Sequence, residues 1–208
     1  MSTEIELINI AKRIKALAQN GLVFSLSEYD TERYQELSEL SDKITSLLTD
    51  CTPIQIQESY LPAKEYVTPK VDIRAVVFND NNEILMVREK ADGLWSLPGG
   101  WADIGFTPKE VAEKEVKEET GLNVKAEKLL AVLDMRNHNH PPSPYYVYKV
   151  FISCKLIDGE FNSVFDILDK GFFKQNEIPP LSSSRILKPQ LDLMFEFHNN
   201  PDKPAVTD

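Results

Sequence analysis

One segment, residues 99–122 (GGWADIGFTPKEVAEKEVKEETGL), constrains this chain most because it carries its own helix start and helix stop. Thr107 precedes a proline, and Glu110 stands three residues after Thr107, which is the pattern of a capping box with proline at the first helical position. Gly121 suits the left-handed residue that ends a helix. The segment therefore predicts a helix over about 108–120.

The predicted helix carries three glutamates on one face. Glu115, Glu118 and Glu119 stand at positions i, i+3 and i+4, so their side chains lie next to one another. Like charges at this spacing cost about 0.2–0.5 kcal/mol per pair, and the last helical turn carries the negative end of the helix dipole. Oxygen ligands of this kind suit a hard divalent ion, so we predict a Mg²⁺ or Mn²⁺ site. A solvated acidic face is the alternative, and the flanking glycines and helix signals argue against it.

These residues resemble the Nudix box, the motif of hydrolases that cleave a nucleoside diphosphate linked to another moiety. The family pattern is Gly, five residues, Glu, seven residues and then Arg-Glu-aliphatic-any-Glu-Glu-any-Gly-aliphatic. Gly100 opens this pattern, and residues 114–122 (KEVKEETGL) close it. The chain departs from the pattern twice, with Phe106 in place of the early Glu and Lys114 in place of the Arg. Because the metal-facing glutamates remain, we interpret these changes as altered scaffolding of the loop.

The resemblance implies that Glu115, Glu118 and Glu119 bind the metal together with the backbone carbonyl of Gly99. A metal at such a site neutralises phosphate oxygens and lowers the pKa of a bound water. The resemblance places the general base either among the helix glutamates, Glu118 or Glu119, or on a loop before the penultimate strand.

On that loop, Asp166 in FDILDKGFF best matches the family position. Asp169 and Glu160 are alternatives, and an ordinary surface acid is the competing reading for Asp166. Arg88 and Lys90 follow a strand that we expect to end near the site, where a basic side chain can meet phosphate. Surface charge is the competing reading for each.

A loop at 135–142 (MRNHNHPP) follows another predicted strand. We predict that its basic side chains, Arg136, His138 and His140, reach the second moiety of the substrate. Metal binding by the two histidines and a plain loop role both remain open. Trp101 and Phe106 are candidates to stack on a base, with core packing as the competing reading.

Two amphipathic helices precede the box region, one from about residue 3 to a stop at Gly21 and one over about 30–49. A helix pair has little core of its own, so its apolar stripes must pack on the main domain or on another subunit. The resemblance implies that this appendage joins two subunits, and we predict a homodimer built partly from residues 1–60. The stripes are Leu7, Ile10, Ile14 and Leu17 in the first helix and Leu37, Leu40, Ile44 and Leu47 in the second.

From residue 70 the pattern becomes that of strands. The order of strands and helices predicts a mixed sheet with helices on its faces, which agrees with the α/β/α sandwich of the Nudix resemblance. We expect a small helical domain at 1–60 and a Nudix-like domain at 61–208. The predicted strands are 71–78, 84–87, 128–134, 145–156 and 172–173, followed by a helix over about 185–197 and a frayed tail after residue 199.

Charge and composition exclude several other classes of protein. The net charge of −10 argues against general nucleic-acid binding, which needs basic patches. No apolar run approaches membrane-spanning length, and the first residues lack the apolar core of a signal peptide. Cys51 and Cys154 are isolated, as in proteins whose thiols stay reduced. We therefore expect a cytoplasmic protein that acts on a small nucleotide.

The helical extension, the segment WSLPGGWAD and the HNHPP loop are similar to the bacterial CDP-choline pyrophosphatase branch of the family. The proline that many ADP-ribose members carry after the box is absent from the matching position near Asn137, and the first proline is Pro141. We predict a nucleoside diphosphate-X hydrolase, with CDP-choline first and ADP-ribose second. The alternatives are a nucleoside triphosphate pyrophosphatase and a non-catalytic, ligand-sensing Nudix domain.

Overall fold

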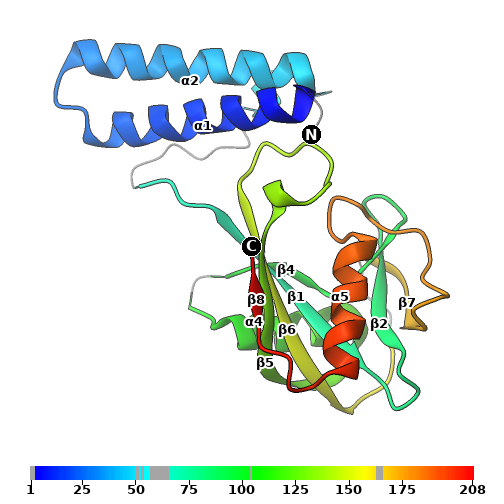
Figure 1. Cartoon of the computed structure of the whole chain (residues 1–208). Helices are drawn as coiled ribbons and strands as arrows, with labels where there is room; N and C mark the ends of the chain where they lie inside the picture. The colour runs from blue at the N-terminus through cyan, green and yellow to red at the C-terminus, as the bar shows by residue number, and fades with distance from the viewer. Residues whose placement is uncertain (1–2, 50–51, 53, 57–65, 104, 163–165) are drawn as a thin grey trace. The chain divides into compact units, whose positions relative to one another are not determined.

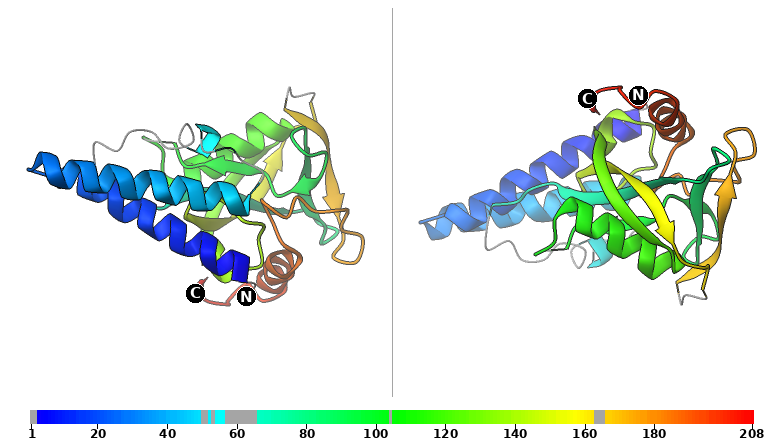
Figure 2. Two further views of the ribbon diagram at one scale, coloured as in Figure 1. Left: turned by 90° about the horizontal axis from the view of Figure 1, so that it is seen from above. Right: turned by 90° about the horizontal axis from the view of Figure 1, so that it is seen from below.

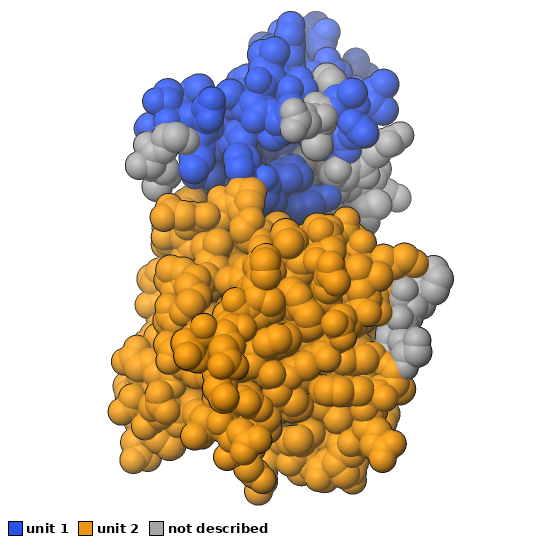
Figure 3. Space-filling model, turned by 90° about the vertical axis from the view of Figure 1, so that its right-hand side faces the viewer, with its two compact units in different colours: residues 1–69, 142–146 blue, residues 70–141, 147–208 orange. Residues whose placement is uncertain are grey.

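The computed structural model describes the chain apart from residues 1–2, 50–51, 53, 57–65, 104 and 163–165, and it divides into two compact units (Figure 3). The first unit comprises residues 1–69 and 142–146, and the second comprises residues 70–141 and 147–208. The domain boundary that we expect after residue 60 lies outside the described residues.

Two helices, α1 (Thr3–Phe24) and α2 (Glu28–Leu48), form most of the first unit (Figure 1). Helix α1 runs past Gly21, so the prediction that it stops there was wrong. Gly21 instead permits close packing, because a Cβ at this position would lie 2.4 Å from Cε1 of Tyr34 on α2. The hydroxyl of Ser27 accepts a backbone hydrogen bond and caps α2.

The contact between α1 and α2 contains buried polar pairs. Lys15 and Asp42 form a buried ion pair with 2.7 Å between Nζ and Oδ2, and Ser41 donates a hydrogen bond to the carbonyl of Ala11. Most members of the predicted apolar stripes remain exposed. Their exposed members are Leu7, Ile10, Leu17, Leu37, Leu40 and Leu47.

The second unit is one mixed sheet with a helix on each face (Figures 1 and 2). Its strands are β1 (Lys70–Phe78), β2 (Ile84–Glu89), β3 (Trp95–Ser96), β4 (Gly99–Trp101), β5 (Asn123–Asp134), β6 (Val147–Asp158), β7 (Ile167–Phe173) and β8 (Val206–Thr207). The order across the sheet is β3-β2-β1-β6-β5-β8, with β4 paired to β1 and β7 to β2. The β1–β6 and β5–β8 pairs are parallel, and the other pairs are antiparallel. This arrangement confirms the predicted α/β/α sandwich.

Helices α4 (Pro108–Thr120) and α5 (Lys188–Asn199) bury apolar side chains against opposite faces of the sheet. Alternation along β1 sends Ile73 into the cluster under α4 and Val76 into the cluster under α5. Because α4 is packed in this way, its glutamate face is left at the edge of the sheet where β4 lies. Within the described ranges, no helix combines the length and apolar character that a membrane crossing requires.

The end of the chain differs from the prediction of a frayed tail after residue 199. Strand β8 pairs in parallel with β5. The carboxylate of Asp208 also accepts hydrogen bonds from the backbone of Asp134 and the side-chain amide of Asn137. These contacts hold the tail against β5 and the loop that follows it. The backbone groups at the edge of a sheet are open to such pairing, and the periodicity of the sequence does not show which segment will use them.

We predict that Asp42→Ala lowers the free energy of unfolding of the helical unit by about 3–5 kcal/mol, because it removes the carboxylate that balances the buried charge of Lys15. The double change Lys15→Met with Asp42→Leu is expected to restore or exceed wild-type stability. Urea unfolding followed by circular dichroism at fixed protein concentration measures both. A loss below about 1 kcal/mol for Asp42→Ala, as for a surface pair, would contradict the prediction.

Candidate active site

The predicted caps hold helix α4 in register. The hydroxyl of Thr107 accepts from the backbone of Glu110 at 3.3 Å, and the carboxylate of Glu110 accepts from the backbone of Thr107 at 2.7 Å. Gly121 has a φ of 87° and donates to the carbonyl of Lys117. The helix bounds and the capping box are therefore confirmed. Because both ends are set locally, the direction of the glutamates is determined before any ligand binds.

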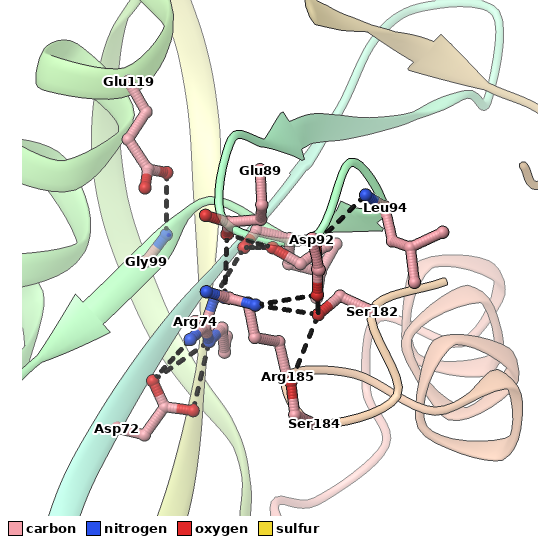
Figure 4. Close-up of polar contacts among 12 residues, drawn as sticks. Asp72, Arg74, Glu89, Asp92, Leu94, Gly99, Glu119, Ser182, Ser184 and Arg185 are labelled. Atoms are coloured by element: carbon pink, nitrogen blue, oxygen red, sulfur yellow. Dashed lines mark hydrogen bonds and ion pairs between the residues drawn. The ribbon is translucent and has the colours of Figure 1, made fainter. Parts of the chain in front are cut away.

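Two of the predicted metal ligands on α4 meet the backbone of strand β4. The backbone N–H of Gly99 donates to Oε2 of Glu119 at 3.0 Å (Figure 4). Gly100 lies against Glu115, since a Cβ on Gly100 would be 3.1 Å from Oε1 of that residue. Gly99 has a φ of 148°, and a Cβ there would be 2.0 Å from the carbonyl oxygen of Ile73. Glycine is required at this position to let strand β4 approach the backbone of strand β1.

The third glutamate, Glu118, is exposed and pairs with Lys114, with 3.1 Å between Oε2 and Nζ. Lys114 also lies 3.3 Å from Oδ2 of Asp103. Phe106 stands where the family pattern has an acidic residue, and Asp103, on the same loop, supplies a carboxylate to Lys114 instead. In the described part of the chain, no three metal-ligating side chains converge on one point.

The electrostatics of the inward glutamates fit a divalent cation. Burial raises the pKa of Glu119 to about 8, opposed by Arg74 and reinforced by neighbouring carboxylates. Burial also raises the pKa of Glu115. Both groups carry hard oxygen donors, and a divalent ion would offset the lost hydration and the mutual repulsion. Glu118 would have to exchange Lys114 for the ion in order to join them.

A buried ion network supports the loop that carries Gly99. Nη2 of Arg74 lies 2.8 Å from Asp72, and Nζ of Lys149 lies 2.5 Å from the same carboxylate. Nη1 of Arg74 donates to the carbonyl of Leu97 at 3.0 Å. Burial opposes the charge on Arg74, but Asp72 outweighs it and raises the pKa of the guanidinium. Arg74 therefore stays charged and holds the loop two residues before Gly99.

Glu89, at the end of β2, belongs to the site although the motif does not include it. Its carboxylate accepts from the hydroxyl of Ser96 at 2.8 Å. The same carboxylate lies 3.2 Å from Nε of Arg185 (Figure 4). Burial of Glu119 is the main cause of its raised pKa, and the negative charge of Glu89 raises that pKa further. A single acid at a strand end carries no pattern of its own. Only its pairing with Arg185, far along the chain, reveals it.

A family model described as the NUDIX domain matches residues 68–181, more than half of the chain. The chain belongs to the Nudix hydrolase family. A second family model, described as a UDP-X-like, N-terminal oligomerisation domain, matches residues 6–60. The positions of the two matches agree with the helical extension and the box-containing sheet.

Three relatives of this Nudix hydrolase cover most of its length. A putative ADP-ribose pyrophosphatase of Bacillus subtilis is 44% identical over 198 residues, 95% of each chain. The crystal structure of an ADP-ribose pyrophosphatase from Streptococcus suis is 42% identical, covers 68% of this chain and 100% of its own, and has a TM-score of 0.62. The structure of a UDP-X diphosphatase is 31% identical with a TM-score of 0.64, and the match covers 100% of both chains.

The remaining predicted site residues of the Nudix domain lie in different surroundings. Arg88 is exposed, and its Nε donates to the carbonyl of Gly93. Asp166 is also exposed, and its backbone carbonyl accepts from the backbone of Lys90 at the end of the β2–β7 pair. Trp101 and Phe106 are 50% and 49% exposed, which argues against core packing and leaves stacking on a base as the proposal.

The loop after β5 does not direct its basic side chains to one place. Arg136 pairs with Asp134 at 3.2 Å, and Nε2 of His138 lies 3.4 Å from Asp208. His140 is buried, its Nδ1 is 2.7 Å from the carbonyl of Ser183, and its Nε2 is 3.0 Å from the amide of Gln190. A carbonyl only accepts, so Nδ1 carries the proton and Nε2 accepts. His140 has no ring nitrogen left for substrate.

We predict that Glu118→Gln and Glu119→Gln each lower turnover at least ~10²-fold, because a metal site supplies several kcal/mol of charge stabilisation. Steady-state kinetics with Mg²⁺ measures the loss. Glu113→Gln is the matched control, because its carboxylate lies on the same helix but accepts from the backbone of Ala126. Near wild-type rates for both site variants would refute the assignment.

We predict that His140 remains neutral, with its proton on Nδ1, down to pH about 4. Burial is the main cause and lowers its pKa to about 4 from 6.5. The unfolded chain takes up the proton first, so this group removes stability as the pH falls from 6.5 to 4. Heteronuclear NMR of the histidine rings follows the titration, and a midpoint near 6.5 would show that the ring is not locked in the core.

Proposed function

We propose that this Nudix hydrolase cleaves the pyrophosphate bond of a nucleoside diphosphate linked to a second moiety, with Mg²⁺ or Mn²⁺ as cofactor. The observation that carries the proposal is the meeting of Glu115 and Glu119 with the Gly99–Gly100 backbone. These carboxylates are half-buried and their pKa values are raised. The cations among the described residues therefore do not fully offset the cost of burying their charges. Such a set is suited to a cation delivered with an anionic substrate.

The chemistry follows from the groups that line the site. A bound divalent ion would neutralise phosphate oxygens and lower the pKa of a water. Glu115, Glu119 and the carbonyl of Gly99 would hold it. The water oxygen attacks phosphorus, the anhydride P–O bond breaks, and a carboxylate takes the proton. Glu118 is exposed and held by Lys114 alone among the described residues, which favours it as the base over Glu119; Asp166 stays a candidate.

For the substrate, we place ADP-ribose first, UDP-linked compounds second and CDP-choline third. The relatives that cover most of the chain are named for ADP-ribose and UDP-X. CDP-choline rests on the sequence resemblance of the loops alone. The exposed rings of Trp101 and Phe106 are our candidates for stacking on the base.

A coupled assay tests the proposal. The full-length protein is incubated with ADP-ribose, a UDP-sugar, CDP-choline and a nucleoside triphosphate, with Mg²⁺, with Mn²⁺ or with chelator, and phosphatase then releases phosphate from the monophosphate products. We expect metal-dependent release from at least one nucleoside diphosphate-X and loss of release in Glu119→Gln. Release from the triphosphate alone, or from none, would overturn the proposal, and the latter result would favour a ligand-sensing role.

We further propose that the helical unit joins two copies of the chain into a homodimer. Helices α1 and α2 bury a polar contact between them and expose apolar side chains, including Leu17 and Leu47. Soluble monomers rarely expose large apolar patches, so a partner surface accounts for the pattern. The oligomerisation description of the family model that matches residues 6–60 supports the same conclusion.

Light scattering tests the dimer at micromolar concentration. The wild-type protein should have about twice the 23.7 kDa mass of one chain. Leu17→Glu with Leu47→Glu should yield a monomer, because a desolvated charge opposes burial of that surface. Arg33→Gln is the control, since Arg33 is an exposed residue of α2 paired with Asp30. A wild-type mass equal to that of one chain would contradict the proposed homodimer.

A further inference from the structure

An acidic site that receives a diphosphate needs a cation from the protein besides the metal. Most basic side chains near the glutamates are already engaged. Arg74 uses Nε and Nη2 on Asp72 and Nη1 on Leu97, and Lys149 is only 2% exposed and also bound to Asp72. Arg88, predicted from the sequence to meet phosphate, is bonded to the carbonyl of Gly93.

Arg185, in the loop before α5, differs from these groups. Its Nε lies 3.2 Å from Glu89, and its Nη1 lies 3.1 Å from Asp92 and 2.9 Å from the hydroxyl of Ser182 (Figure 4). Its side chain is 27% exposed. With the residues that the structure describes, Nη2 makes no hydrogen bond, so one edge of the guanidinium keeps donors available.

The partners of Arg185 are themselves held in place. Ser182 is fully buried, and its backbone N–H donates to the carbonyl of Trp95 at 2.8 Å. Its hydroxyl donates to Asp92 at 2.7 Å, and Asp92 also accepts from the backbone of Leu94. The guanidinium is therefore oriented before any ligand arrives, which reduces the entropy lost on binding.

We propose that Arg185 donates from its open edge to a phosphate oxygen of the substrate, while Glu89 and Asp92 hold the guanidinium. Glu89 interacts electrostatically with both Glu119 and Arg74, and Arg185 contacts Glu89, so one carboxylate links Arg185 to the proposed metal ligands (Figure 4). A guanidinium suits this role because it stays charged and presents parallel N–H donors to phosphate. This inference rests on the proposed hydrolase function.

The test compares three measurements on the full-length protein: calorimetric binding of inorganic pyrophosphate with Mg²⁺, binding of Mn²⁺ alone by electron paramagnetic resonance, and KM for whichever nucleoside diphosphate substrate the wild type hydrolyses. Arg185→Gln should weaken pyrophosphate binding and raise KM by about 10- to 100-fold, the size of a charge-assisted contact. Its Mn²⁺ affinity should stay within about twofold of wild type. Arg185→Lys should recover part of the loss.

Two further variants distinguish a contact between Arg185 and phosphate from a purely structural role of Arg185. Asp92→Asn weakens one contact that holds Arg185 but keeps the guanidinium, so it should weaken pyrophosphate binding less than Arg185→Gln does. Lys188→Gln removes a charge near the same helix start, where Lys188 pairs with Asp192, and should change nothing. If Arg185→Gln does not fold, the same binding and KM measurements on Arg185→Lys and Asp92→Asn test the inference. Arg185→Lys should then lose more pyrophosphate affinity than Asp92→Asn.

Unchanged pyrophosphate binding in Arg185→Gln would overturn the inference while leaving the hydrolase intact. So would a parallel loss of Mn²⁺ binding, or a loss in Asp92→Asn equal to that in Arg185→Gln, because both indicate a role through other groups. A wild-type protein that binds no pyrophosphate and hydrolyses no substrate would overturn the proposed function itself, and the inference with it.

Discussion

The hydrogen bond from the backbone of Gly99 to Glu119 joins the sheet to helix α4, and the site depends on it. It forms only because Gly99 has no side chain to collide with the carbonyl of Ile73, and because Gly121 and Thr107 set the ends of the helix. Arg74 supports the same contact by holding the carbonyl of Leu97. The backbone of β4 therefore stands where a metal ligand and a close approach to phosphate are both possible.

Charge balance is the second constraint on the site. Glu119 loses hydration on burial, and Arg74 offsets only part of the cost, so the pKa of Glu119 rises. A hydrophobic residue in place of Glu119 would avoid the cost of burying a charge, but it would also remove a ligand of the proposed cation. Carboxylates with raised pKa values are thus consistent with a functional site, because a bound ligand can offset the cost of burying them.

The helical unit illustrates what periodicity predicts and what it misses. The spacing of leucines and isoleucines correctly predicted two helices, but spacing alone does not say which face meets the neighbouring helix. The buried pair of Lys15 and Asp42 lies in the contact between the helices, a position that the spacing of apolar residues does not predict. Gly21 was read as a helix stop, whereas the ring of Tyr34 beside it shows that it serves close packing. That partner is distant in sequence and carries no local signal.

The sequence by itself determined helix α4, its caps and the shared face of its glutamates, because these depend on interactions between residues at most four apart. It also determined the class of fold, through the order of strands and helices. Tertiary structure alone decided the pairing of Lys114 with Asp103, the core position of His140 and the assembly of Glu89 with Arg185. Each of these joins loops or strands that only the folded sheet brings together, so no spacing along the chain encodes it.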